Sequence, residues 1–115
     1  MLRVAMLSKW HVHAADYAKQ FMNTPNSTVA AVWDTDLARG EAWAKELGCD
    51  FVADLDALLA RDDIDAVTLP LPDQEHCVVA CDALRAGKHV LCEKMIAIDS
   101  GELSEMISEA KKQDK

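Results

Sequence analysis

The sequence predicts a doubly wound α/β fold, in which a parallel β-sheet lies between two layers of helices. Short apolar runs, typical of strands buried on both faces, alternate with segments whose apolar residues recur every three or four positions. Clusters of turn residues separate these segments. Because strands and helices alternate strictly, we expect parallel strands joined by right-handed crossovers in a three-layer α/β/α arrangement.

The first half of the chain contains two pairs of strand and helix. Residues 3–7 (RVAML) are a short apolar run, and apolar residues at helical spacing follow from Ala14 onward. Asp36 is placed to cap the second helix, and Gly48 is placed to end it. The expected elements are strands at 3–7 and 28–33 and helices at 14–22 and 37–47.

The second half continues the alternation with shorter strands. Asp54 is placed to cap a short helix, and Gly87 is placed to end a longer one. Residues 99–102 resemble a capping box, and Lys111 and Lys112 suit the C-terminal end of the last helix. The expected elements are strands at 51–52, 65–69 and 89–92 and helices at 55–60, 73–86 and 99–112.

The composition is that of one globular domain. Half of the 115 residues are hydrophobic, which is enough to form a core without disulfides. The formal net charge of −8 argues against nucleic acid as a partner, because phosphate backbones attract basic surfaces. No apolar run approaches the roughly 18 residues of a membrane span. We therefore expect a cytoplasmic protein without membrane contact, whose four cysteines are free thiols.

The loop after the first strand is where a dinucleotide pyrophosphate is expected, yet residues 8–13 (SKWHVH) contain no glycine. Glycines there allow a tight turn and let backbone N–H groups approach phosphate. Ser8 and Lys9 offer a hydroxyl and a charge instead, and we expect Trp10 and His11 to contact the cofactor as well. The alternative is a degenerate loop filled by its own side chains, with His11 and His13 packed inside it.

Asp34 ends the second strand, 26 residues after Ser8. A carboxylate at this place accepts hydrogen bonds from the adenosine ribose hydroxyls and repels a 2′-phosphate. We therefore expect NAD as the cofactor, with NADP disfavoured. The alternative is a helix-capping role that Asp34 shares with Thr35 and Asp36.

Two stretches of the sequence resemble the Gfo/Idh/MocA oxidoreductases. Residues 65–97 read DAVTLPLPDQEHCVVACDALRAGKHVLCEKMIA, close to the family's D-A-V-x-x-x-T-P-N-x-x-H segment followed by A-L-x-A-G-K-H-V-x-C-E-K-P. Residues 28–48, TVAAVWDTDLARGEAWAKELG, look like the family's second strand and helix. The resemblance implies a Rossmann fold and a two-domain dehydrogenase that acts on sugars, polyols or related small hydroxy compounds with NAD or NADP.

The resemblance also implies roles for individual residues. Asp34 matches the ribose-binding acid, and Pro72 and His76 match the cofactor-side T-P-N-x-x-H loop. Glu93 and Lys94 match the first two residues of the E-K-P motif. In the family that lysine contacts substrate and nicotinamide and assists proton transfer, so Lys94 is the expected catalytic residue, and Glu93 is expected beside the cofactor.

The chain departs from the family pattern in three places. The first loop lacks its glycines, Leu71-Pro72-Asp73 stands for Thr-Pro-Asn, and Met95 stands where the family has proline after the lysine. The aspartate places a negative charge near the cofactor. The family's proline often takes a cis peptide bond. Without it, the direction of the Lys94 side chain is less firmly fixed.

The histidines and cysteines do not lead us to expect a metal site. Neither the H-x-H of His11 and His13 nor the spacing of Cys77 and Cys81 is that of a common structural zinc site. Cys77 and Cys81 lie one helical turn apart and are expected to pack as small apolar residues.

Together these features predict the nucleotide-binding domain of an oxidoreductase, spanning residues 1–115, with an α+β substrate domain outside this chain. That domain would bind the small-molecule substrate and set any homo-oligomer. The chain alone should fold as a two-sided sheet, bind dinucleotide weakly or not at all, and show no turnover. The main alternative is a non-catalytic binding or dimerisation module that has lost the phosphate-binding glycines. A metal-dependent hydrolase is a weaker one.

Overall fold

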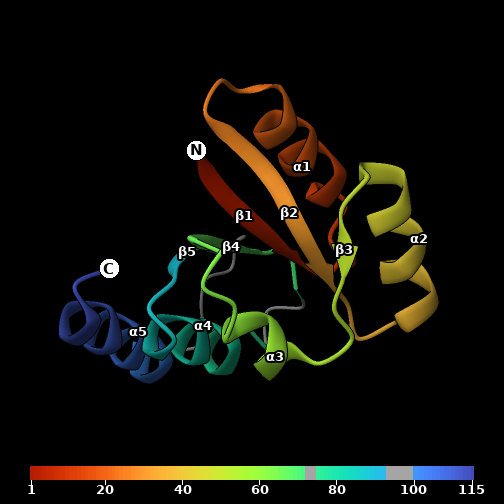
Figure 1. Ribbon diagram of the computed structural model, residues 1–115. Helices are drawn as coiled ribbons and strands as arrows, with labels where there is room; N and C mark the ends of the chain where they lie inside the picture. Colours follow the sequence, from red (N-terminus) through yellow and green to blue (C-terminus); the bar gives the residue numbers. More distant parts are fainter. Residues whose placement is uncertain (72–74, 93–99) are drawn as a thin grey trace.

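The computed structural model describes residues 1–71, 75–92 and 100–115 (Figure 1). Five strands in the described residues form one sheet in the order β3-β2-β1-β4-β5, and every pair is parallel. The strands are β1 (Leu2–Leu7), β2 (Ser27–Trp33), β3 (Asp50–Phe51), β4 (Ala66–Leu69) and β5 (His89–Cys92). From β1 the chain moves outward to β3 and then crosses to β4 on the other side. The crevice beyond the carboxyl ends of β1 and β4 is thus the topological switch point, where such sheets bind ligands.

Helices cover both faces of the sheet, as the alternation predicts (Figure 1). They are α1 (Ala14–Asn23), α2 (Leu37–Leu47), α3 (Leu55–Leu59), α4 (His76–Arg85) and α5 (Ser100–Gln113). Successive residues of β1 point to opposite faces: Val4 and Met6 pack with α1 and α2, whereas Ala5 and Leu7 pack with α3, α4 and α5. The two cores that result confirm the predicted Rossmann-like α/β fold.

Helix ends follow the capping signals of the sequence. Asp36 and Asp54 cap α2 and α3 by accepting hydrogen bonds from the backbone N–H groups of Arg39 and Asp56. Gly48 ends α2 in the left-handed conformation with a φ of 72°. The predicted start of α4 at residue 73 and of α5 at residue 99 lie outside the described residues.

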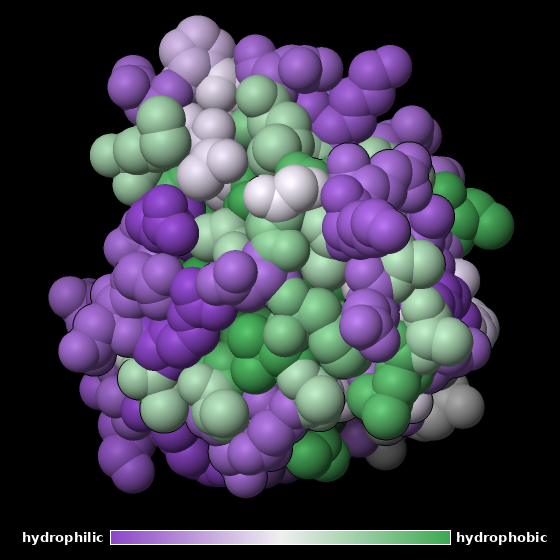
Figure 2. Space-filling view, turned by 45° about the vertical axis from the view of Figure 1, so that its right-hand side comes forward, coloured by the Kyte–Doolittle hydropathy of each residue, from purple (hydrophilic) through white to green (hydrophobic). Residues whose placement is uncertain are grey.

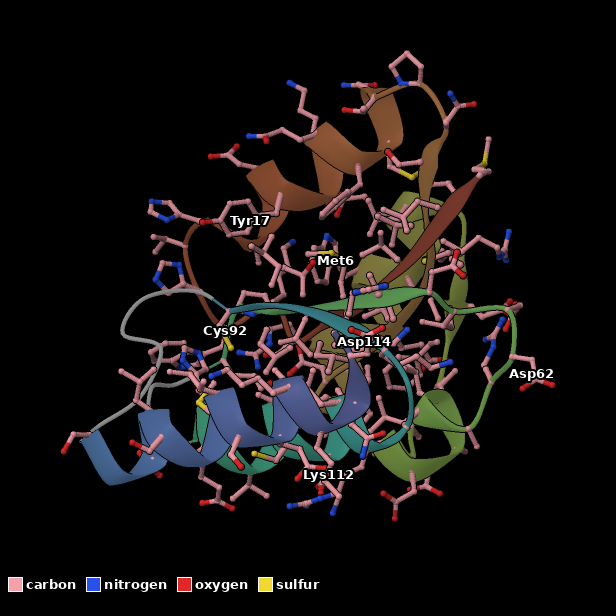
Figure 3. All side chains as sticks on the ribbon, turned by 90° about the vertical axis from the view of Figure 1, so that its left-hand side faces the viewer. Met6, Tyr17, Asp62, Cys92, Lys112 and Asp114 are labelled. Carbon is pink, nitrogen blue, oxygen red and sulfur yellow. The ribbon has the colours of Figure 1, made fainter. Side chains whose placement is uncertain are left out.

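One edge of the sheet carries exposed apolar side chains. On the α1 side, Leu2 and Leu91 remain 42% and 49% exposed. Figure 3 looks onto this edge, with α1 above the sheet and α4 and α5 below it. A groove of about 400 Å³ lies here, lined mainly by apolar atoms of Leu2, Tyr17, Phe21, Pro25 and Leu91.

The surface mixes polar and apolar side chains. On the face shown in Figure 2, hydrophilic residues surround an area where hydrophobic ones gather. Within the described part of the chain, we find no helix whose length and hydrophobicity suit a membrane crossing.

Candidate functional site

The carboxyl ends of β1 and β2 bring together the two loops that the sequence singles out. Ser8 and Lys9 leave β1 beside Asp34, which leaves β2. Strands β4 and β5 also end here, at Leu69 and Cys92. Pro72, Glu93 and Lys94 lie outside the described residues, so the site is built here from the first two loops and from His76.

The Asp34 carboxylate is buried and accepts hydrogen bonds on both oxygens. Its Oδ2 accepts the backbone N–H of Lys9 at 3.0 Å, and its Oδ1 accepts the Ser8 hydroxyl at 3.1 Å and the Asp36 N–H at 3.2 Å. Arg39 forms a bidentate pair with it, from Nε to Oδ2 at 2.8 Å and from Nη2 to Oδ1 at 2.6 Å. Asp34 is therefore the centre of a network that joins the β1 loop to α2.

This network keeps Asp34 ionised. Burial by itself would raise the pKa of the carboxyl group, but the hydrogen bonds from Arg39, Lys9, Asp36 and Ser8 outweigh it and lower the pKa from 3.8 to about 2. The same pairing raises the pKa of Arg39. The Arg39 side chain is 31% exposed, so the buried carboxylate meets solvent through a guanidinium.

Ser8 takes over the conformation that a fingerprint glycine would supply. Its φ is 86°, in the left-handed region that residues with a Cβ rarely adopt, and it is fully buried. The hydroxyl donates to Asp34 and accepts the backbone N–H of Trp10 at 3.0 Å. The turn geometry is thus retained without glycine, and a hydroxyl occupies the space inside it.

The backbone N–H groups of this loop bond to the protein itself. Those with protein acceptors are the N–H groups of Lys9, Trp10, His11, His13 and Ala14. The His11 N–H reaches the Pro70 carbonyl at 3.1 Å, so it ties the β1 loop to the loop after β4. In an ordinary dinucleotide-binding loop such groups face the pyrophosphate. In the described structure these five N–H groups bond to acceptors in the loop itself, in Asp34 and in Pro70.

The side chains of Lys9, Trp10 and His11 point in different directions. The Lys9 ammonium lies 3.8 Å from Glu46 and 5.7 Å from the ring centre of Trp43, so it faces α2. Trp10 is 51% exposed, and its ring meets that of His11 edge to face at a centroid distance of 6.2 Å. Of the residues predicted to contact the cofactor, Trp10 and His11 thus form a partly exposed aromatic surface. Lys9 is instead paired with Glu46.

Comparison with known proteins decides the family. The model of the oxidoreductase family with an NAD-binding Rossmann fold matches residues 10–115. This chain belongs to the Gfo/Idh/MocA oxidoreductase family. A dTDP-3,4-didehydro-2,6-dideoxy-α-D-glucose 3-reductase of Streptomyces antibioticus is 40% identical over 87 residues, which are 76% of this chain and 26% of that enzyme. A UDP-N-acetylglucosamine 3-dehydrogenase of Acidithiobacillus ferrooxidans is 34% identical over 112 residues, 95% of this chain and 33% of that enzyme.

Solved structures of the family agree with the fold. A 3-ketoreductase from Actinomadura kijaniata in complex with NADP and TDP-benzene superposes with a TM-score of 0.90 at 30% identity, over 97% of this chain and 34% of that one. An NAD-binding protein from Listeria innocua superposes with a TM-score of 0.91 at 28% identity, over 99% of this chain and 33% of that one. The chain thus spans about a quarter to a third of the length of the relatives it matches.

His76, which the family motif places beside the cofactor, is fully buried in this oxidoreductase domain. Its Nε2 lies 3.0 Å from the Leu71 carbonyl, and it begins α4. The described contact links the start of α4 to Leu71. A direct cofactor contact by His76 stays a prediction.

Sequence reasoning missed two residues that shape the Asp34 network. Arg39 follows Asp34 by five positions and lies in the first turn of α2. A basic residue so soon after the acid that ends the strand could have indicated an ion pair between them. Gly40 lies within α2, where a Cβ would come 2.7 Å from the Cβ of Asp34 and 2.6 Å from Cε1 of Phe51. A glycine inside a helical pattern signals such a close approach.

Cys77 and Cys81 are buried in the core between the sheet and α4, as predicted for small apolar residues. The other two cysteines, Cys49 and Cys92, are partly buried, and all four are free thiols.

Proposed function

We propose that this chain is the NAD-binding domain of an oxidoreductase that acts on a sugar, a polyol or a related small hydroxy compound. The observation that carries the proposal is the ionised Asp34 carboxylate at the carboxyl end of β2, next to the loop after β1. Hydrogen-bond acceptors for ribose hydroxyls belong at this place in a Rossmann fold. The sugar-nucleotide enzymes among the relatives support the substrate class.

The residues fit the adenosine ribose of a dinucleotide better than its pyrophosphate. Asp34 fits the adenosine ribose, provided that it exchanges some of its present donors for ribose hydroxyls. The N–H groups of the β1 loop fit a pyrophosphate less well, because protein acceptors already occupy them. We therefore expect weak, saturable binding by the chain alone.

The choice of NAD over NADP rests on the negative charge of Asp34, which disfavours a 2′-phosphate. The 3-ketoreductase of Actinomadura kijaniata, whose structure contains NADP, shows that the family also uses the phosphorylated cofactor. Arg39 neutralises part of the Asp34 charge, so we expect a moderate preference.

Titration of the tryptophan fluorescence with NADH and NADPH tests this proposal. Trp10 is exposed within the loop after β1, so bound dinucleotide should quench its fluorescence. We expect NADH to bind at least roughly tenfold more tightly than NADPH, a difference of about 1.4 kcal/mol. In Asp34→Asn the preference should vanish, whereas in the control Asp36→Asn it should persist. Equal affinities in the unchanged chain would remove the ribose role.

The reacting end of the site is assigned to Lys94 by its match to the family motif. A bound nicotinamide supplies or accepts the hydride, and the Lys94 Nζ would hold or move the proton of the reacting hydroxyl. The substrate would be held by an α+β domain outside this chain. In the full-length protein, Lys94→Ala should lower kcat far more than it weakens NAD binding; near-normal kcat would disprove this role.

A non-catalytic binding or dimerisation module is the second candidate function. One observation favours it: the β1 loop uses its own Ser8 hydroxyl and its own acceptors where the family places glycines and phosphate. Absence of quenching at millimolar NADH, together with a concentration-dependent dimer in sedimentation, would favour this module over the dehydrogenase. We keep the cytoplasm as the proposed location, because free thiols are typical of a reducing compartment.

A further inference from the structure

Three groups that metal ions favour converge between α4 and α5. Cys77 and Cys81 lie one turn apart on α4, and Glu105 faces them from α5. The two sulfur atoms and a Glu105 carboxylate oxygen all lie within 4.8 Å of one another. Two helices thus bring two thiols and a carboxylate to one point.

We propose that Cys77, Cys81 and Glu105 form a binding site for one zinc ion. Zinc takes thiolate ligands at about 2.3 Å and carboxylate ligands at about 2.0–2.2 Å in tetrahedral geometry, which places the ligand atoms roughly 3.5–3.8 Å apart. Side-chain shifts of about 1 Å bring the observed group into this range. The spacing differs from common structural zinc sites, but two histidines at positions i and i+4 of one helix bind zinc in the H-E-x-x-H motif. The fourth position is left for water.

The contacts within the cluster place two oxygen atoms beside a buried thiol. The Cys77 thiol lies 3.6 Å from Oε2 of Glu105 and 3.8 Å from the Glu102 carbonyl, so oxygen atoms surround a sulfur at the edge of an apolar core. Zinc binds cysteine as the thiolate, so the two thiol protons leave to solvent when the metal binds.

Access to the site is open on one side. Cys77 and Cys81 are only 4% and 2% exposed, whereas Glu105 is exposed at the surface of α5. An ion can therefore first meet the Glu105 carboxylate and then reach the thiols. Because Glu105 belongs to the second turn of α5, bound zinc would fix the beginning of α5 against α4.

Cobalt and zinc titrations of the reduced, chelator-stripped 115-residue chain test the site. Cobalt(II) bound to two thiolates gives an intense near-ultraviolet charge-transfer band, and we expect this band to saturate at one equivalent. Zinc should then displace the cobalt and abolish the band. A chain that shows no thiolate band with excess cobalt would overturn the proposal.

Variants separate this site from other thiols and acids. Cys81→Ala should abolish the band, and Glu105→Gln, which changes only an exposed side chain, should weaken zinc binding by at least about tenfold in competition with a chromophoric chelator. Cys49→Ser and Glu41→Gln are the matched controls and should bind zinc like the unchanged chain. If Cys81→Ala does not fold, the Glu105→Gln result decides, and unchanged affinity in that variant would contradict the assignment.

Discussion

The loops after β1 and β2 begin side by side at the same edge of the sheet, yet they match the family pattern to different degrees. The loop after β2 keeps the acid of that pattern in Asp34, and Asp36 caps the helix that follows. The loop after β1 has lost every glycine. Its first residue, Ser8, nevertheless keeps a φ of 86°.

The comparison shows which property of the loop the fold requires. The fold requires a tight turn after β1, and Ser8 adopts it at some conformational cost. Binding of a phosphate requires unpaired N–H groups, whereas those of Trp10, His11 and His13 already bond to protein acceptors. The loop therefore keeps a tight turn but offers few free N–H groups to a phosphate.

The largest expected effect concerns the buried acid that joins the two loops. Asp34→Ala leaves Arg39 without its carboxylate and removes the acceptor of the Lys9 N–H. We expect the free energy of unfolding to fall by about 3 kcal/mol, near the lower end for broken buried ion pairs because Arg39 is partly exposed. Urea denaturation measures this loss. Asp36→Ala, which removes only a helix cap, should cost about 1 kcal/mol; equal losses would mean that Asp34 is no more than a cap.

Acid should reproduce part of this loss. The pKa of Asp34 is lowered in the folded protein from 3.8 to about 2, so ionised Asp34 contributes stability that is fully present above pH 3.8 and is lost as the pH falls through about 2. The contribution is about 2 kcal/mol. Between pH 5 and pH 2, the free energy of unfolding should therefore fall by about 2 kcal/mol more in the unchanged chain than in Asp34→Asn. Denaturation curves at the two pH values measure this difference. Identical pH dependence in the two proteins would show that the Asp34 network is not formed.

Gly40 tests how closely α2 must approach β2. Gly40→Ala gains helix propensity of about 1 kcal/mol, but its Cβ would clash with Asp34 and Phe51. We expect a net loss of about 1–2 kcal/mol in the free energy of unfolding, measured by thermal denaturation. Ala38→Gly on the exposed side of α2 is the control and should cost only the propensity. A more stable Gly40→Ala protein would contradict the close approach.

The smallest expected effect restores a glycine to the β1 loop. Ser8→Gly relieves the strain of the left-handed conformation and frees the Trp10 N–H. NADH affinity should therefore rise roughly threefold, which corresponds to the free energy of one weak net hydrogen bond. Ser8→Ala also frees this N–H but keeps the Cβ, and it should bind less tightly than Ser8→Gly. Calorimetry with the three proteins measures the series. Weaker binding by Ser8→Gly would mean that the Ser8 hydroxyl itself contacts the cofactor.

The fold was predictable because its signals are local. Alternation of apolar runs, the caps Asp36 and Asp54, and the terminating Gly48 give the element order and most helix ends. The Asp34 and Arg39 pair was not predicted, because the direction of a carboxylate depends on which donors the folded backbone brings to it.

The remaining differences also arise from tertiary packing. Nothing in a serine indicates that Ser8 would adopt a positive φ. The approach of Glu105 to Cys77 depends on how α5 packs on α4, and the exposed Leu91 depends on what covers β5. Such contacts join segments far apart in the chain, where sequence periodicity carries no information.

Backbone amide chemical shifts of the isotope-labelled chain, followed during titration with NADH, test most directly whether this domain binds dinucleotide at the ends of β1 and β2. We predict saturable shifts concentrated in residues 8–14 and 34–39, with the amides around Lys88 at the opposite end of the sheet unchanged. Shifts confined to the groove beside Leu91, or no saturable shift at millimolar NADH, would contradict the assignment of this edge as the dinucleotide site.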